Sequence, residues 1–123
     1  MTSIASEQEI DRRERPDLRI ERPGIAPISI EIKWVENWTI KELLERLENQ
    51  LIGQYLRDAK SHYGIYLLGY IGRQTFWKDP INQSRFSFDQ VVSIIDERAK
   101  AIVTERRDIE DIAVISINFT EPL

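Results

Sequence analysis

The stretch that decides the fold is Ile28-Ser29-Ile30-Glu31-Ile32-Lys33. Apolar and polar residues alternate along it with a period of two, and the apolar ones are β-branched, which is typical of a half-buried strand. The alternation predicts that the three isoleucines face the core, while Ser29, Glu31 and Lys33 share the other, open face.

Elements on both sides of this strand follow from turn chemistry and periodicity. A short strand is expected at residues 18–20, because Arg22-Pro23-Gly24 supplies a turn directly after it. Downstream, Thr39 and Glu42 form a capping box, and apolar residues then recur at helical spacing. We therefore expect an amphipathic helix that ends near Asp58 and lies on the sheet.

The second half of the chain predicts a strand, a helix and a strand. Residues 63–71 are almost continuously apolar, as in a central strand covered on both faces, and a loop should follow at 73–85. A second capping box opens a helix over 87–104, and residues 112–119 alternate like a strand. The element order predicts an α/β domain with a mixed sheet.

Length and composition narrow the kind of protein. The 123 residues fit one domain, here 16–123, with 1–15 as a flexible arm or weak helix. No apolar run is long enough to span a bilayer and no signal peptide is evident, so we expect a cytoplasmic protein without membrane contact. The absence of cysteine and the single histidine exclude thiolate and His-rich metal sites, which leaves hard cations such as Mg²⁺ or Mn²⁺.

The charge balance leaves two readings of the N-terminal arginines. The net charge is −4, yet 12 of the 17 cationic residues are arginine, and five of these fall within residues 12–22. They form either a phosphate-binding patch or a solvated arm interleaved with acids.

Three residues carry the candidate chemistry. Glu31 and Lys33 stand two apart on a strand, so both side chains leave the same face and can converge on one phosphate. Asp17 precedes the neighbouring strand, and a hairpin should bring its carboxylate within reach of a cation held by Glu31. The metal would activate a water molecule, and Lys33 would stabilise developing negative charge.

The motif Pro16-Asp17, a spacer of 13 residues and then Glu31-Ile32-Lys33 resembles the signature of the PD-(D/E)XK nuclease superfamily. The resemblance implies a restriction endonuclease-like three-layer core, with a mixed central sheet flanked by helices. It also implies that Asp17, Glu31 and the Ile32 carbonyl bind Mg²⁺ or Mn²⁺, and that Lys33 stabilises the transition state. The implied activity is hydrolysis of phosphodiester bonds, with DNA as the expected substrate.

The helix after the motif supplies a further candidate, Gln50. Some branches of the superfamily carry a Gln and a Tyr four residues apart on this helix, whereas here Gln50 is followed at that spacing by Gln54, and Tyr55 comes one later. Tyr55 is either a core residue or a displaced site residue. We expect Gln50 and Lys33 to face the same pocket, because Gln50 lies at the border of the apolar stripe.

Several alternatives stay open. His62 fits a loop residue better than a general base, and Trp34 and Trp38 fit either packing or base stacking. A convincing first helix is missing, which fits either a minimal domain or part of a longer protein. A nuclease core of 123 residues offers little surface to hold a duplex, so we expect a homodimer or attachment to a larger recognition or sensor assembly. The alternative function is an inactive nuclease-fold scaffold or nucleic-acid-binding module, and a third reading is a structural domain with an accidental motif.

Overall fold

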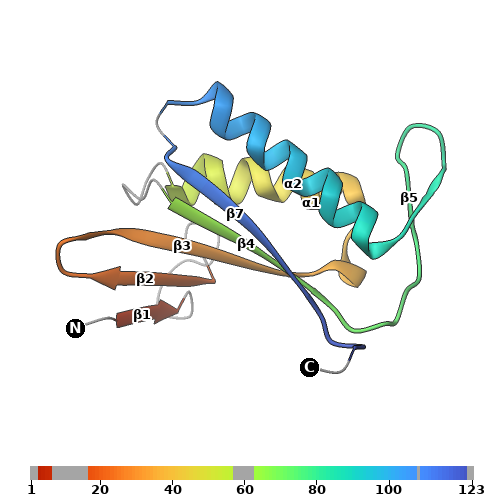
Figure 1. Ribbon diagram of the computed structural model, residues 1–123, viewed down its shortest axis with the longest axis horizontal. Helices are drawn as coiled ribbons and strands as arrows, with labels where there is room; N and C mark the ends of the chain where they lie inside the picture. The colour runs from red at the N-terminus through yellow and green to blue at the C-terminus, as the bar shows by residue number, and fades with distance from the viewer. Residues whose placement is uncertain (1–2, 7–16, 57–62, 108, 122–123) are drawn as a thin grey trace.

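The computed structural model describes residues 3–6, 17–56, 63–107 and 109–121, which form a mixed five-stranded sheet with helices packed on it (Figure 1). The strand order is β1-β2-β3-β4-β7. The strands are β1 (Ser3–Ser6), β2 (Leu18–Arg22), β3 (Ile25–Trp34), β4 (Tyr63–Tyr70) and β7 (Asp111–Asn118). The predicted order of strands and helices after residue 16 is confirmed.

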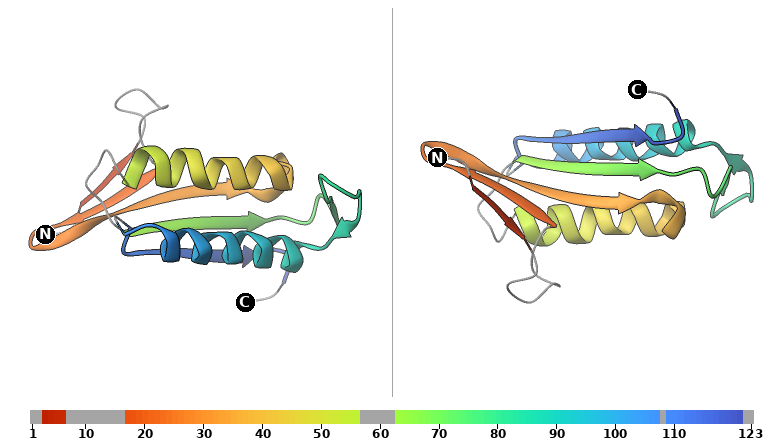
Figure 2. Two further views of the ribbon diagram at one scale, coloured as in Figure 1. Left: turned by 90° about the horizontal axis from the view of Figure 1, so that it is seen from above. Right: turned by 90° about the horizontal axis from the view of Figure 1, so that it is seen from below.

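The sheet combines an antiparallel half with a parallel half. β1, β2 and β3 pair antiparallel, whereas β3, β4 and β7 pair parallel, each parallel step being bridged by a helical connection. Two successive right-handed crossovers in one direction place their helices on the same side of a sheet. Both connections therefore cover one face, as the two views of Figure 2 show. The α/β class and the mixed sheet are confirmed, and a third layer remains a prediction.

The first connection begins as the capping box predicts and then changes character. A single 3-10 turn, η3 (Val35–Asn37), leads to Thr39, whose side chain accepts from the Glu42 amide while Glu42 accepts from the Thr39 amide. The α-helix α1 (Ile40–Arg46) follows, and the chain then continues as a π-helix, η4 (Leu47–Leu56). The prediction of one α-helix to about Asp58 was therefore wrong after Arg46, where the helix widens to π-helical turns. Residues 57–62 lie outside the description.

Gly53 fits the wider turn of η4. A Cβ atom added at Gly53 would lie 3.0 Å from the carbonyl oxygen of Glu48, five residues earlier. That carbonyl is the acceptor position of a π-helix, in which hydrogen bonds join residues five apart. The absence of a side chain at Gly53 therefore lets the wide turn close without a steric conflict.

The second connection follows its prediction closely. α2 (Phe88–Glu105) begins at a Ser87 capping box and packs on β7, with Val91, Ile95 and Ala99 fully buried. Before it, β5 (Trp77–Lys78) and β6 (Arg85–Phe86) form a small hairpin inside the segment predicted as a loop. Such two-residue strands are too short to show a periodic pattern, so they could not be predicted from the sequence.

The face assignment of β3 was wrong. Its alternation is confirmed, but Ser29, Glu31 and Lys33 are buried beneath the helices. Ile28, Ile30 and Ile32 are only half-buried on the opposite face. β4 repeats this pattern: Tyr66 and Leu68 are fully buried on the helix side, and its other face is not fully covered. Burial of the charged residues is possible because they pair with each other and with neighbours on the helix side.

Two further findings concern the beginning of the chain and its helices. Ser3–Ser6 pair with β2 as a strand, which differs from the arm or weak helix expected for 1–15, and residues 7–16 lie outside the description. The Pro23-Gly24 turn is confirmed, with Gly24 at a φ of 78° that favours glycine. In the part of the chain that the structure describes, no helix is long and apolar enough to cross a membrane.

Candidate active site

Glu31 and Lys33 form a buried pair where β3 passes beneath η4. Their side chains leave the same face of β3, and Lys33 Nζ lies 2.9 Å from Glu31 Oε1. Lys33 also donates to Gln50 Oε1 of η4 at 3.2 Å, so the two side chains are in contact. Glu31 is 4% exposed and Lys33 7%, which means that the pair is held almost entirely within protein.

Asp17 joins this pair from the neighbouring chain segment. It directly precedes β2, whose first residue, Leu18, is opposite Ile30 in the antiparallel hairpin. The same register places Asp17 opposite Glu31. Its Oδ2 atom accepts a 2.7 Å hydrogen bond from the Ile32 amide. Since the N–H and C=O groups of a residue in an antiparallel pair point to the same side, the Ile32 carbonyl is directed toward Asp17 as well.

The pKa of Glu31 reflects its burial and its two charged neighbours. Burial raises the pKa of Glu31 from 4.5 to about 7, Lys33 opposes this rise, and Asp17 adds to it through both charge and hydrogen bonding. Two acids and one cation therefore share one poorly solvated site, in which one negative charge is in excess when both acids are ionised.

An aromatic ring covers the Lys33 side of the cluster. Lys33 Nζ lies 4.6 Å from the centroid of the Trp38 ring, and the Arg46 guanidinium lies 5.1 Å from the same centroid. Cations at these distances are attracted by the ring quadrupole. Trp38 therefore belongs to the site, whereas Trp34 lies against Gly69 and Phe119 on the opposite face of the sheet.

The residues present fit a divalent cation with oxygen ligands. Glu31 Oε2 is buried and, among the described residues, has no hydrogen-bond partner, so this oxygen has a lone pair to offer. Asp17 and the Ile32 carbonyl lie on the same side, and two carboxylates with a carbonyl and water satisfy Mg²⁺ or Mn²⁺. No cluster of three or more Asp, Glu, His or Cys side chains that could hold a metal occurs within the described ranges.

Two polar residues of this surface were not among the site residues predicted from the sequence. Arg19 is opposite Ser29 in the β2–β3 register, so both lie on the face that carries Glu31. Arg19 is held by Glu21 at 2.6 Å, and the Ser29 hydroxyl is buried without a partner among the described residues. The signal was available, because both stand two positions from a candidate ligand and period two places them on its face.

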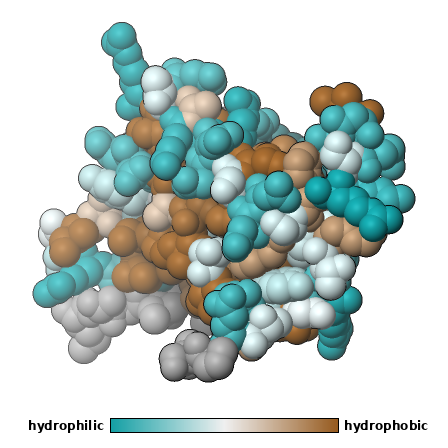
Figure 3. All heavy atoms as spheres, turned by 45° about the vertical axis from the view of Figure 1, so that its right-hand side comes forward, coloured by the Kyte–Doolittle hydropathy of each residue, from teal (hydrophilic) through white to brown (hydrophobic). Residues whose placement is uncertain are grey.

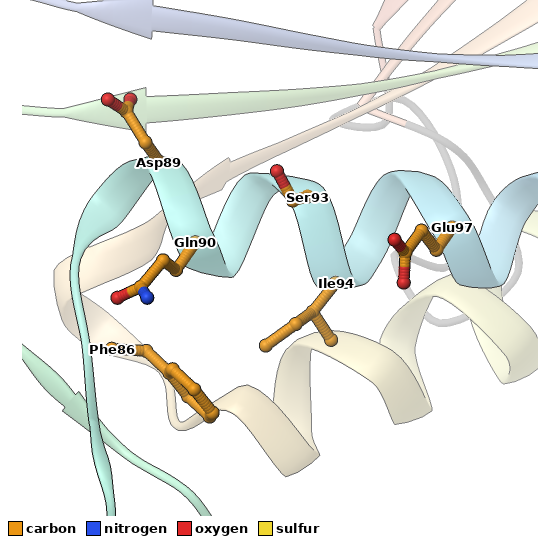
Figure 4. Close-up of a pocket in the computed structure, with 6 residues that line it drawn as sticks. All are labelled: Phe86, Asp89, Gln90, Ser93, Ile94 and Glu97. Atoms are coloured by element: carbon orange, nitrogen blue, oxygen red, sulfur yellow. The ribbon is translucent and has the colours of Figure 1, made fainter.

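Two hollows lined by residues that the structure describes lie away from this cluster. One of about 450 Å³ runs past Trp38 toward Phe76 and Trp77. Another of about 350 Å³ lies on the N-terminal half of α2, where Phe86 and Ile94 line it together with acidic side chains (Figure 4). Neither includes Asp17, Glu31 or Lys33. Of these three residues, Asp17 is half-buried, whereas the other two are buried.

The remaining candidates lie outside what the structure describes. These are the side chains of Gln54 and Tyr55, and His62 as a whole.

Comparison with known proteins adds no family assignment. No family model matches this chain, and no curated protein and no solved structure matches it significantly. The likeness to PD-(D/E)XK nucleases therefore rests on the motif and on the geometry of the residues in it.

Proposed function

We propose that this chain is a metal-dependent nuclease that hydrolyses phosphodiester bonds, with DNA as the first substrate to test. Asp17 and Glu31, with the Ile32 carbonyl, bind Mg²⁺ or Mn²⁺, and Lys33 is the cation that meets the phosphate. The observation that carries the proposal is the convergence of Asp17 and Lys33 on Glu31, from residues 16 positions apart in the chain.

Each residue has a distinct part in this chemistry. Bound Mg²⁺ would lower the pKa of a water molecule and neutralise phosphate charge. Glu31 must lose its proton before it can hold the cation. Because its pKa is raised to about 7, this proton loss occurs near neutral pH. Lys33 stabilises the negative charge that develops on the phosphate oxygens, and the Gln50 amide holds the ammonium group in position.

A second function is favoured by the burial of the pair. Because Glu31 and Lys33 are almost fully enclosed and hydrogen-bonded to each other, they also fit a structural ion pair in an inactive nuclease-fold scaffold. Metal binding separates the two functions. A nuclease needs Glu31 Oε2 for the cation, whereas in a scaffold the hydrogen bond between the Asp17 and Glu31 carboxyl groups is sufficient.

The test combines cleavage with direct metal binding. Purified chain is incubated with supercoiled plasmid and Mg²⁺ or Mn²⁺, alongside Lys33→Ala and a matched control, Lys41→Ala, whose lysine is exposed on α1. Cleavage should be lost with Lys33→Ala and kept with Lys41→Ala. Calorimetric titration with Mn²⁺ should show binding to the unsubstituted chain and none to Asp17→Asn. Equal cleavage by both lysine variants, or no Mn²⁺ binding, would leave the scaffold function.

A further inference from the structure

The hollow that reaches Trp38 lies between two segments that are distant in the chain. Residues 36–39 and 42, around the start of α1, form one side, and residues 74 and 76–78, which lead into β5, form the other. The hairpin of β5 and β6 projects beyond this end of the helices in Figure 1. At about 450 Å³ the hollow has the size of a small-molecule site, so it has room for one residue of a larger ligand.

Three of the residues that line this hollow are aromatic. Trp77 is 2% exposed, and its indole nitrogen donates to the Val35 carbonyl at 3.2 Å, so its position is fixed. Trp38 and Phe76 are half-buried, and part of each side chain stays accessible. Accessible aromatic rings offer flat faces on which another ring can stack. The lining therefore favours a planar, aromatic ligand.

The polar groups of the lining suit an uncharged ligand edge. The Glu36 carboxylate accepts from two backbone amides that follow β4, and the Glu42 carboxylate accepts from the Thr39 amide. Both acids are thus engaged within the protein. The Asn37 side chain is exposed, and no hydrogen bond engages it within the part of the chain that the structure describes. Its amide can donate and accept, which matches the edge of a nucleobase.

The hairpin beside the hollow is basic, although the whole chain has a net charge of −4. Residues 73–86 contain three cations, Arg73, Lys78 and Arg85, and one acid, Asp79, which leaves an excess of two positive charges. The Arg85 guanidinium lies 4.3 Å from the centroid of the Phe76 ring. Figure 3, which brings this end of the molecule forward, shows mostly hydrophilic residues on the projecting hairpin. The ligand that fits therefore carries negative charge next to its ring, as a nucleotide does.

Trp38 connects this hollow with the candidate active site. It lines the hollow, and its ring centroid lies 4.6 Å from Lys33 Nζ and 5.1 Å from the Arg46 guanidinium. A nucleotide whose base lies against Trp38 thus has cations of the site close to its phosphate. Aromatic side chains that stack bases beside a positively charged track are the usual means of binding single strands.

We propose that the hollow binds an unpaired base of single-stranded DNA, with Lys78 and Arg85 on the flanking phosphates. This inference rests on the proposed nuclease function, for which it names the substrate class. A base inside a duplex is stacked on both sides and its pairing edge is occupied, so it must leave the duplex before it can enter the hollow. The chain should therefore act on single strands and on frayed or opened regions of DNA.

The first experiment measures binding without cleavage. Fluorescence anisotropy, with a chelator present, compares a labelled single strand of about 20 nucleotides with the duplex that it forms with its complement. The single strand should bind about tenfold more tightly. Phe76→Leu removes the ring but keeps an apolar side chain, and it should weaken single-strand binding about fivefold or more. Phe119→Leu is the matched control without effect, because Phe119 lies against Trp34 on the opposite face of the sheet.

A lysine variant tests the phosphate contact without disturbing the core, because Lys78 is exposed. Lys78→Ala should weaken binding of the single strand and make it less dependent on salt, since one phosphate contact and its counterion are lost. Lys100→Ala, whose lysine is exposed on α2, is the matched control and should change neither quantity. The proposal is overturned if single strand and duplex bind equally, or if either variant behaves like its control.

A cleavage assay separates this inference from the nuclease function. With Mg²⁺ or Mn²⁺ present, the single strand should be cut faster than the duplex, and Phe76→Leu should reduce that difference. Tight binding of the single strand without any cleavage would refute the nuclease function and leave the base-binding site in place. Cleavage of both substrates at equal rates would refute the base-binding site and leave the nuclease function in place.

Discussion

Replacement of Glu31 by glutamine should stabilise the metal-free fold while it destroys the metal site. Glu31 is buried, and its pKa rises from 4.5 to about 7 on folding, chiefly because burial disfavours the ionised form. At a pH between these two pKa values, folding takes up a proton. The free energy of unfolding therefore falls as the pH rises from about 4.5 to about 7. At about 1.4 kcal/mol per pH unit, the loss amounts to roughly 3 kcal/mol.

Glutamine keeps the shape of the neutral side chain but cannot ionise. Glu31→Gln should therefore match the parent chain near pH 4.5 and exceed it by roughly 3 kcal/mol at about pH 8. Urea unfolding of both chains, with a chelator present, measures the difference at each pH, and an unchanged m-value shows that the unfolded states are alike.

A second carboxylate provides a control of opposite sign. Hydrogen bonds from Thr39 lower the pKa of Glu42, so this carboxylate stabilises the fold above its unfolded pKa, and that stability is lost as the pH falls. Glu42→Gln should therefore be less stable than the parent at neutral pH, with the deficit shrinking in acid. If Glu31→Gln behaved in the same way, the ion pair with Lys33 would outweigh burial, and the reasoning above would be refuted.

Three further predictions concern the same region. Gln50→Ala should slow cleavage about tenfold and lower the free energy of unfolding by about 1 kcal/mol, because buried Lys33 loses a hydrogen-bond acceptor. Gln50→Glu restores an acceptor and should recover the free energy of unfolding, measured in urea. Gly53→Ala should destabilise the chain in thermal unfolding, instead of giving the gain of about 1 kcal/mol expected in an ordinary helix, and a gain would mean that the wide turn of η4 does not persist. Mg²⁺ should raise the melting temperature more at about pH 8 than at about pH 6, because Glu31 must ionise to bind the ion. An equal rise in melting temperature for Asp17→Asn would mean that the ion binds elsewhere.

Period-two alternation predicted β3 correctly but not which face the helices cover. The face that contains Glu31 and Lys33 was predicted to be the solvent side, because two ionisable groups within three residues are rarely buried. Burial depends on partners distant in the sequence: Gln50 and Trp38 surround Lys33, and Asp17 adjoins Glu31. The direction of the two crossovers, which fixes the covered face, leaves no trace in a single strand's pattern.

Features that depend only on residues close together in the sequence were predicted correctly. The capping boxes at Thr39 and Ser87 fixed both helix starts, because each depends on residues three positions apart. The Pro23-Gly24 turn correctly brought the Asp17 segment back beside β3. The π-helical turns of η4 could not be predicted from the sequence, since apolar residues four and five apart fit both an α-helix and a π-helix.

The wide turns of η4 bear on how related sequences should be aligned. A π-helical turn, closed between residues five apart, holds one residue more than an α-helical turn. Deleting a single residue within 47–56 would let the segment close as an ordinary helix, but it would rotate every later side chain about 100° around the axis. A one-residue gap before Gln50 in a homologue would thus move the amide away from Lys33 without altering either residue, whereas a gap after it would leave that contact in place and shift Gly53 instead.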